Sequence, residues 1–199
     1  MCQGCPLTLE IFLMAIGEKC FLYYNMVMFT DPIKNLKQFG IREDMIVADL
    51  GAGTGFYSIA LAHMVPHGKV YAIEIQKDFL TTIKNKIKEA RLKNIECFLG
   101  NIEKIGGTKI KDEVIDAVII SNVLFQAENK EKFIEEAKRI LKPSGKILVI
   151  DWADSSNLGI NKKSVISKEK MRDMFEKKGF IYDRDINAGV HHYGMIFNK

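Results

Sequence analysis

The sequence is poor in the features that mark secreted, membrane-spanning or disulfide-rich proteins. Four cysteines among 199 residues do not make a disulfide framework in a chain of this length, so we expect reduced thiols and a cytoplasmic protein. The N-terminus lacks the positively charged segment of a signal peptide. The most apolar stretch, residues 7–29, is interrupted by Glu10, Glu18, Lys19 and Asn25, which leaves no run long enough to span a membrane.

The sequence also lacks a strong charge of either sign, internal repeats and low-complexity tracts. Its 29 basic and 25 acidic residues give a net charge of +4, an excess too small to require nucleic acid or an anionic membrane as a partner. The composition, 47% hydrophobic and 27% charged, is that of a globular protein. The length predicts one domain, which we place at residues 31–199 after an apolar leader at residues 1–30.

What the sequence does contain is a regular alternation of short apolar strands and amphipathic helices. We expect one helix to begin at Asp31, a suitable N-cap, and Pro32, a suitable first helical residue, and to end at Gly40. Further helices are predicted at residues 57–64, 77–92, 129–141 and 167–178. Strands are predicted at residues 45–50, 69–75, 95–99, 114–121, 146–152, 180–187 and 191–198, with a turn at 142–145.

The pattern of these strands predicts an α/β fold. Near-continuous apolar strands separated by helices indicate a mostly parallel sheet with helices on both faces. The last two strands are joined by a link around residues 187–189, which is too short for a parallel crossover, so this pair must be antiparallel. In such a sheet, the ligand crevice lies at the carboxyl ends of the strands.

The most informative segment joins the first of these strands to the next helix. Its glycines, Gly51, Gly53 and Gly55, allow positive φ angles and let a ligand lie against bare backbone. A dinucleotide fingerprint would need a glycine at position 56, where this chain has Phe56. Glu74 ends the second strand, where a carboxylate can accept hydrogen bonds from two ribose hydroxyls. The segment therefore predicts a nucleoside site.

These residues resemble the cofactor site of class I S-adenosylmethionine-dependent methyltransferases. The family pattern of an acidic residue followed by G-x-G-x-G matches residues 49–55, and its acidic residue after the second strand matches Glu74. The resemblance continues through residues 116–122 and 141–146 and covers residues 30–199. Within the family, the chain is similar to the small-molecule branch that includes ubiquinone/menaquinone-biosynthesis C-methyltransferases. The resemblance implies a Rossmann-like, seven-stranded sheet in the order 3-2-1-4-5-7-6, with the last strand antiparallel.

The resemblance also implies S-adenosylmethionine as the cofactor and gives roles to residues by position. The backbone of Gly51, Ala52 and Gly53 would face the methionine part of the cofactor. Asp49 would help to hold the turn and the methionine ammonium group, and Glu74 would accept the ribose hydroxyls.

The adenine part of the cofactor is assigned in the same way. Ile75 would pack on one side of the ring and Ile102 on the other. Asn101 stands where the family usually has Asp, and its amide oxygen can still accept a hydrogen bond from the adenine amino group. Gly55 and Ser121 complete the expected set of cofactor-binding residues.

The methyl acceptor is expected to meet the cofactor at the ends of the fourth and fifth strands. Methyl transfer is an in-line displacement, so the enzyme mainly aligns the reactants and sometimes removes a proton. No cysteine lies at either strand end, so a covalent cysteine mechanism finds no nucleophile there. The candidate catalytic residues are Asn122, Asp151 and His192, and the further candidates for acceptor contact are Gln126, Trp152, His191 and Tyr193.

We therefore expect a methyltransferase that acts on a small, partly apolar acceptor. The alternatives are an RNA or protein methyltransferase and, from another class, a non-catalytic sensor or partner protein that binds S-adenosylmethionine. The leader, with Tyr23, Tyr24 and Phe29, is interpreted as a lid, as an oligomer or membrane-surface patch, or as a segment that orders on ligand binding. Cys2 and Cys5 form a single C-x-x-C pair, so free thiols are favoured and no metal site is expected.

Overall fold

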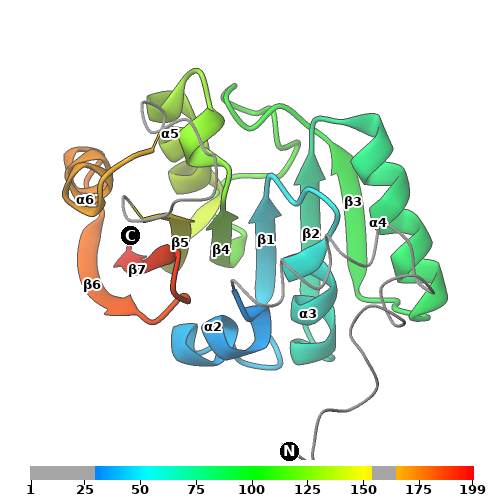
Figure 1. Cartoon of the computed structure of the whole chain (residues 1–199). Helices are drawn as coiled ribbons and strands as arrows, with labels where there is room; N and C mark the ends of the chain where they lie inside the picture. Colours follow the sequence, from blue (N-terminus) through cyan, green and yellow to red (C-terminus); the bar gives the residue numbers. More distant parts are fainter. Residues whose placement is uncertain (1–29, 154–164) are drawn as a thin grey trace, which may run out of the picture.

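A computed structural model describes residues 30–153 and 165–199 of the chain, and the rest lies outside the described residues. The strands are β1 (Ile46–Leu50), β2 (Lys69–Glu74), β3 (Ile95–Leu99), β4 (Ile115–Ser121), β5 (Leu141–Trp152), β6 (Ile181–Ile186) and β7 (His192–Asn198). They form one sheet in the order β3-β2-β1-β4-β5-β7-β6 (Figure 1). β7 is antiparallel to both of its neighbours, and the other pairs are parallel. The predicted fold class and strand order are confirmed.

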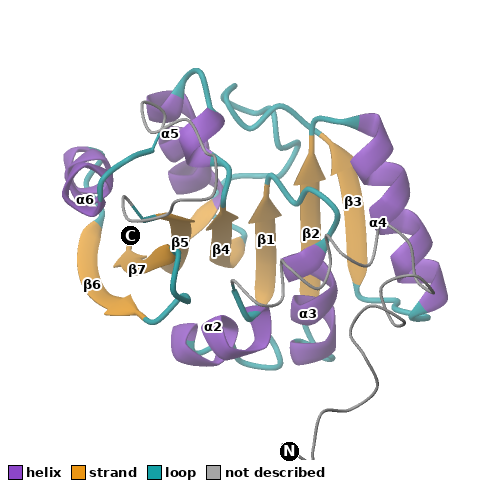
Figure 2. Cartoon of the chain, in the orientation of Figure 1, coloured by secondary structure: helices purple, strands orange, loops and turns teal. Residues whose placement is uncertain are grey.

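The helices are α2 (Pro32–Phe39), α3 (Phe56–Met64), α4 (Lys77–Glu89), α5 (Lys130–Ile140) and α6 (Lys168–Lys177), with a short 3-10 helix, η1 (Leu124–Gln126). Side chains of α2, α3 and α4 pack on one face of the sheet, and those of α5 and α6 pack on the other. Figure 2 shows these helices, in purple, around the sheet. Within the described ranges, no helix is both long and apolar enough to cross a bilayer.

Local sequence explains where α2 begins and ends. The Asp31 carboxylate caps the helix by accepting a hydrogen bond from the Lys34 backbone at 3.1 Å, and Pro32 follows at the first turn. Gly40 ends the helix in the left-handed conformation at φ 75°, as predicted. Leu36 and Phe39 are buried against the sheet. This helix lies beside α3.

The register of the central strands brings three strand ends to one edge of the sheet. Asp49 pairs with Ala72 on β2 and with Ile119 on β4, so β1, β2 and β4 end at similar heights. Figure 1 shows the arrowheads of these strands at the same edge. Ligands of open α/β sheets bind at this edge, because loops there leave a crevice that the strands themselves hold rigid.

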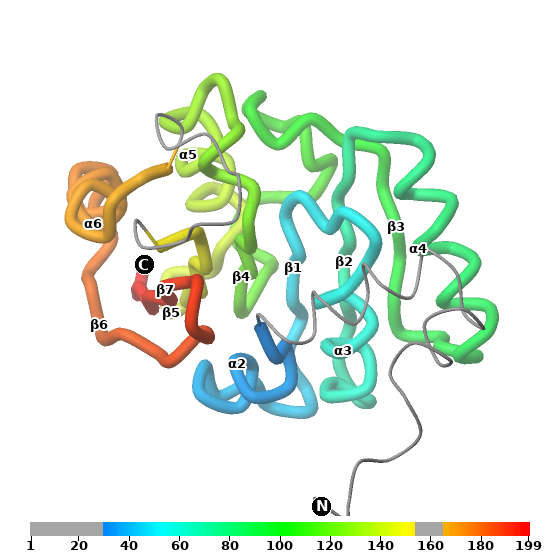
Figure 3. Tube along the Cα trace, in the orientation of Figure 1, coloured from blue at the N-terminus to red at the C-terminus, as the bar shows by residue number. Residues whose placement is uncertain are grey.

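The start of β5 and the β3–β4 connection differ from a regular alternation of strands and helices. β5 begins at Leu141 rather than at residue 146, but its register with β4 shifts, because Ile115 pairs with Leu141 and Ala117 pairs with Lys146. The residues between these pairs, 142–145, coincide with the predicted turn. The segment from β3 to β4, residues 100–114, contains turns but neither helix nor strand (Figure 3, green).

Candidate active site

A cavity of about 450 Å³ opens at the carboxyl ends of β1, β2 and β4. Five segments line it: Thr30 before α2, the turn after β1 with the start of α3, the end of β2 with the start of α4, the beginning of the β3–β4 connection, and the segment that follows β4. Most of the predicted cofactor set lies on these walls, namely Asp49, Gly51, Ala52, Gly53, Glu74, Ile75, Asn101, Ile102 and Ser121.

The three glycines of the turn have different structural roles. Gly51 has φ 77°, and a Cβ there would lie 2.7 Å from Val123 Cγ2. Gly53 has φ 54°, and no atom lies within 4 Å of the position that its Cβ would take, so this part of the cavity wall is bare backbone. Gly55 has φ 81° and precedes α3, and a Cβ there would meet Ile83 of α4. Gly55 is therefore a packing residue that does not line the cavity.

Glu74 is a buried carboxylate, 5% exposed, that faces this turn from the end of β2. Its Oε2 accepts a hydrogen bond from the Gly53 backbone, and its Oε1 accepts from the Ile75 and Gln76 backbones, all at 2.8 Å. A carboxylate has about four acceptor positions, so one remains on Oε2. In the described part of the chain, no Lys or Arg forms an ion pair with Glu74.

Asp49 adds a second buried carboxylate to the same wall. It is 2% exposed and accepts a hydrogen bond from Ser58 Oγ at 2.5 Å. Burial raises the pKa of Asp49 to about 6; the Ser58 hydrogen bond opposes this effect, and the charge of Glu74 adds to it. The site is therefore short of positive charge, which a cationic ligand would supply.

Apolar side chains border the expected adenine end of the cavity. Ile75 is 57% exposed and Ile102 is 9% exposed, and both line the cavity with Phe79 of the first turn of α4. Asn101 Oδ1 accepts a hydrogen bond from the Glu103 backbone at 2.9 Å, which leaves one of its lone pairs for a ligand. Phe79 was not among the predicted residues. Its position in the first turn of the helix that follows Glu74 could have indicated a role in the cavity wall.

A polar cluster also borders the cavity. Asn35 Nδ2 donates to Tyr57 Oη at 2.8 Å and to Thr30 Oγ1 at 2.9 Å, and Thr30, Tyr57 and Ser121 line the cavity. Burial raises the pKa of Tyr57. Thr30 and Tyr57 were not predicted from the sequence. Tyr57 belongs to an apolar stretch of α3, which suggests a core position.

Asn122 lies on the side of the cavity expected to receive the acceptor. It has φ 54°, its Nδ2 lies 3.1 Å from His192 Nε2, and its buried Oδ1 has no hydrogen-bond partner among the described residues. The His192 ring packs against Trp152, with ring centroids 4.2 Å apart. His192 does not line the cavity, and instead contacts Asn122 from behind.

Asp151 also lies behind the cavity wall. It is 1% exposed and accepts hydrogen bonds from the Phe125 backbone at 3.2 Å and the Trp152 backbone at 2.8 Å. Burial raises the pKa of Asp151 to about 6, and the two backbone hydrogen bonds oppose this effect. The bond to Phe125 holds η1, whose Gln126 does line the cavity. Of the seven predicted acceptor-side residues, the cavity is lined by Asn122 and Gln126.

Several sequence predictions fall outside the described residues. These are the leader up to residue 29, with Tyr23, Tyr24 and Phe29, and the cysteines Cys2, Cys5 and Cys20. Residues 154–164, which follow β5, also fall there.

The sheet order, the glycine turn after β1 and the carboxylate after β2 together define the class I methyltransferase fold. A family model described as a methyltransferase domain matches residues 41–191. The chain therefore belongs to this family of S-adenosylmethionine-dependent methyltransferases.

Individual relatives agree with this assignment. A crystal structure of an S-adenosylmethionine-dependent methyltransferase from Aquifex aeolicus is 31% identical, with a TM-score of 0.80, and the match covers 86% of this chain and 91% of that one. A demethylmenaquinone methyltransferase from Geobacillus sp. (strain WCH70) is 26% identical over 72% of this chain and 64% of its own length. An arsenite methyltransferase from Halobacterium salinarum is 28% identical over 53% of this chain and 26% of its own length. The chain thus spans less than two thirds of these curated relatives.

Proposed function

We propose that the protein transfers a methyl group from S-adenosylmethionine to a small, partly apolar acceptor. The observation that carries the proposal is Glu74, a buried carboxylate that faces the bare backbone of Gly53 and keeps one acceptor position open. A ribose hydroxyl fits that position. The positive charge of a sulfonium nucleoside suits a cavity that holds both Glu74 and Asp49.

The cavity residues would bind the cofactor and align it with the acceptor. S-adenosylmethionine, when bound, supplies an electrophilic methyl group on sulfur. Glu74 and the glycine turn would hold the nucleoside, and ionised Asp49 would attract the positive end of the cofactor. Rigid placement matters because in-line displacement requires the acceptor atom, the methyl group and sulfur to be aligned.

The acceptor side combines polar and apolar groups. Asn122 and Gln126 provide amides, while Val123 and Ala127 provide apolar surface. Because Asn122 Oδ1 is buried without a described partner, an acceptor that donates a hydrogen bond to it would remove a penalty of about 1–3 kcal/mol. The relatives named for demethylmenaquinone and arsenite also support a small-molecule acceptor.

Asp151 and His192 are assigned to positioning rather than to direct proton transfer. Asp151 fixes the segment that carries Gln126, through the Phe125 backbone, and His192 fixes the amide of Asn122. Neither side chain lines the cavity. Asn122 is the candidate that would touch the acceptor.

Calorimetric titration with S-adenosylhomocysteine tests the cofactor site. The wild type should bind this ligand, and Glu74→Ala should weaken binding by about tenfold to a hundredfold, because a hydrogen bond to a charged group contributes about 1.5–3 kcal/mol. Glu89→Ala, which removes an exposed carboxylate at the end of α4, is the matched control and should bind like the wild type. Binding of NAD in place of S-adenosylhomocysteine would contradict the proposal.

A labelling experiment tests the acceptor class. The protein is incubated with a methyl-labelled donor and cell extract, which is then separated into small-molecule and lipid, RNA and protein fractions. Label in the first fraction supports the proposal, and label in RNA or protein supports the alternative enzymes. Ligand binding without any transfer would support a non-catalytic sensor.

A further inference from the structure

The β3–β4 connection, residues 100–114, is an irregular crossover. Parallel strands are usually joined through an α-helix, whose backbone groups satisfy one another. This connection has no helix, yet it contributes Ile102 and Ile110 to the core on the α5 side of the sheet. Buried backbone N–H groups here need other partners.

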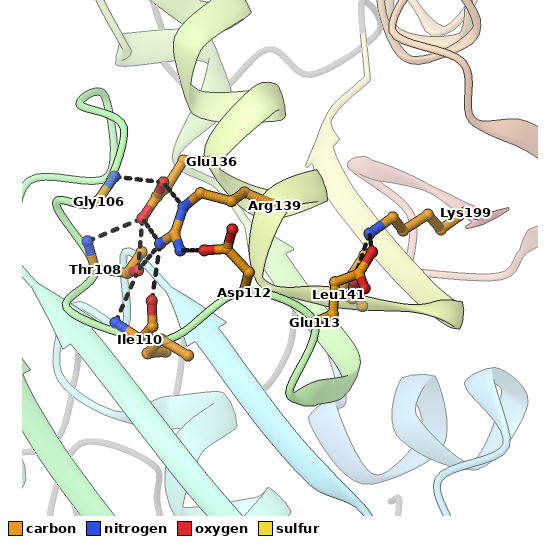
Figure 4. A network of polar contacts seen from close by, with 9 residues as sticks. All are labelled: Gly106, Thr108, Ile110, Asp112, Glu113, Glu136, Arg139, Leu141 and Lys199. Carbon is orange, nitrogen blue, oxygen red and sulfur yellow. Dashed lines mark hydrogen bonds and ion pairs between the residues drawn. The ribbon is translucent and has the colours of Figure 1, made fainter.

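Glu136 of α5 supplies those partners. Its side chain is fully buried, and its carboxylate accepts hydrogen bonds from the Gly106 backbone at 2.8 Å, the Thr108 backbone at 3.1 Å and Thr108 Oγ1 at 2.6 Å (Figure 4). One carboxylate thus organises the middle of the connection.

Arg139, one turn further along α5, completes the network. It donates to both Glu136 oxygens, at 2.8 and 2.7 Å, and to the Ile110 carbonyl at 2.9 Å, and it forms an ion pair with Asp112 (Figure 4). Burial would raise the pKa of Glu136, but hydrogen bonds from Arg139, Thr108 and Gly106 lower it to about 2. We refer to Glu136, Arg139, Thr108, Gly106 and Asp112 as the Glu136 network.

The segment held by this network touches the cavity wall directly. A Cβ built on Gly107 would lie 1.9 Å from the Asn101 carbonyl oxygen, and one built on Gly100 would lie 2.6 Å from the Gly107 carbonyl oxygen. Gly100 and Asn101 line the cavity. These backbones are in contact, so residues 106–108 support this part of the wall.

A second contact from α5 acts on the same wall. The Asn129 backbone, at the N-cap of α5, donates to Glu103 Oε2 at 2.5 Å, and Glu103 lines the cavity. α5 therefore holds the connection at two places, at Glu103 near its start and at residues 106–108 in its middle.

We propose that Glu136 is a positioning residue for the adenine base of the cofactor, acting through the backbone of residues 106–108 on Gly100 and Asn101. The proposal rests on the proposed function, since it assumes that adenine occupies this end of the cavity. Glu136 itself does not line the cavity.

The test compares wild type and Glu136→Gln for binding S-adenosylhomocysteine and S-inosylhomocysteine by calorimetry. These ligands differ at the base, where adenine carries an amino group and hypoxanthine an oxygen. Glu136→Gln should lose about tenfold in affinity for the adenine ligand and should lose most of the preference for adenine over hypoxanthine. Hydrogen exchange in residues 100–108 should also become faster in the unliganded variant.

A control separates positioning from a general loss of stability. Phe175→Leu weakens the Phe175–Phe197 stacking, at 4.6 Å between centroids, on α6 and β7, and should leave the base preference unchanged. If Glu136→Gln does not fold, Thr108→Val removes one donor to the same carboxylate and should reduce the preference in the same direction.

The outcomes distinguish the two proposals. A folded variant that binds both ligands like the wild type, or that loses affinity for both equally, overturns the positioning role. A wild-type protein that binds neither ligand overturns the proposed function, and this inference with it.

Discussion

Glu74 and Glu136 are both buried glutamates, but the protein uses them in opposite ways. Glu74 ends a strand, accepts only backbone hydrogen bonds and borders the cavity. Glu136 lies inside a helix, and its negative charge is neutralised by the Arg139 guanidinium, which donates hydrogen bonds to both carboxylate oxygens. Glu74 is ready for a ligand, whereas the charge of Glu136 is already compensated.

The difference teaches how a binding carboxylate can be recognised. Burial alone does not identify one, because Glu136 is more buried than Glu74. The useful criterion is whether the protein already provides a cation and fills the acceptor positions. By that criterion, Asp49 belongs with Glu74, since the side chain that donates a hydrogen bond to it within the described ranges is the neutral Ser58 hydroxyl.

The largest expected effect is on stability. Glu136→Ala should lower the free energy of unfolding by about 3–5 kcal/mol, because it leaves the largely buried Arg139 without its partner. Glu74→Gln should lower the free energy of unfolding by no more than about 1.5 kcal/mol, since this change leaves no buried cation without its partner. Urea denaturation of both variants measures the difference. Equal losses of unfolding free energy would contradict the view that Glu136, unlike Glu74, compensates a buried cation.

The next effect concerns Asp49 and pH. Its folded-state pKa of about 6 lies above the ordinary value of 3.8 for an aspartate, so between these pH values the folded protein keeps a proton that the unfolded chain has released. This group therefore stabilises the fold at low pH and loses that contribution as pH rises through 6. Relative to Asp49→Asn, the wild type should lose about 2 kcal/mol between pH 4 and pH 7.

Denaturation of wild type and Asp49→Asn at pH 4 and pH 7 measures this change. Asp173→Asn, on the exposed side of α6, serves as the control for replacing a carboxylate. A stability difference between wild type and Asp49→Asn that is the same at both pH values would contradict the burial argument.

The smallest effect is expected at the outer end of the Glu136 network. The Asp112 side chain is 73% exposed, so its ion pair with Arg139 is screened by water. Asp112→Asn should change the free energy of unfolding by about 0.5 kcal/mol or less. If Asp112→Asn lowered the free energy of unfolding as much as Glu136→Ala, the exposed ion pair rather than the buried carboxylate would contribute most of the stability of the network.

The fold could be predicted from the sequence because its strands are short, apolar and separated by clear stop signals. The short link before β7 determined the antiparallel pair, and Gly40 marked the end of α2. The position of Glu74 followed from its spacing to the glycine turn, because strand ends of a parallel sheet meet at one edge.

Other features depend on contacts between distant segments. Glu135 and Glu136 are adjacent acidic residues in a charged helix, and only the packing of the β3–β4 connection makes Glu136 buried. Asp151 and His192 lie at the expected strand ends, but local sequence does not reveal that each supports a neighbouring residue from behind. These placements required the three-dimensional structure.

The reversed direction of β7 determines which end of that strand can influence chemistry. Its first residue, His192, reaches Asn122 beside the cavity, whereas Lys199 donates its backbone N–H to the Gly145 carbonyl at the opposite edge of the sheet. A fluorophore or affinity tag attached after Lys199 would therefore be a whole strand length from the crevice. Labelling at that position offers a way to immobilise the protein for ligand measurements without obstructing the entrance.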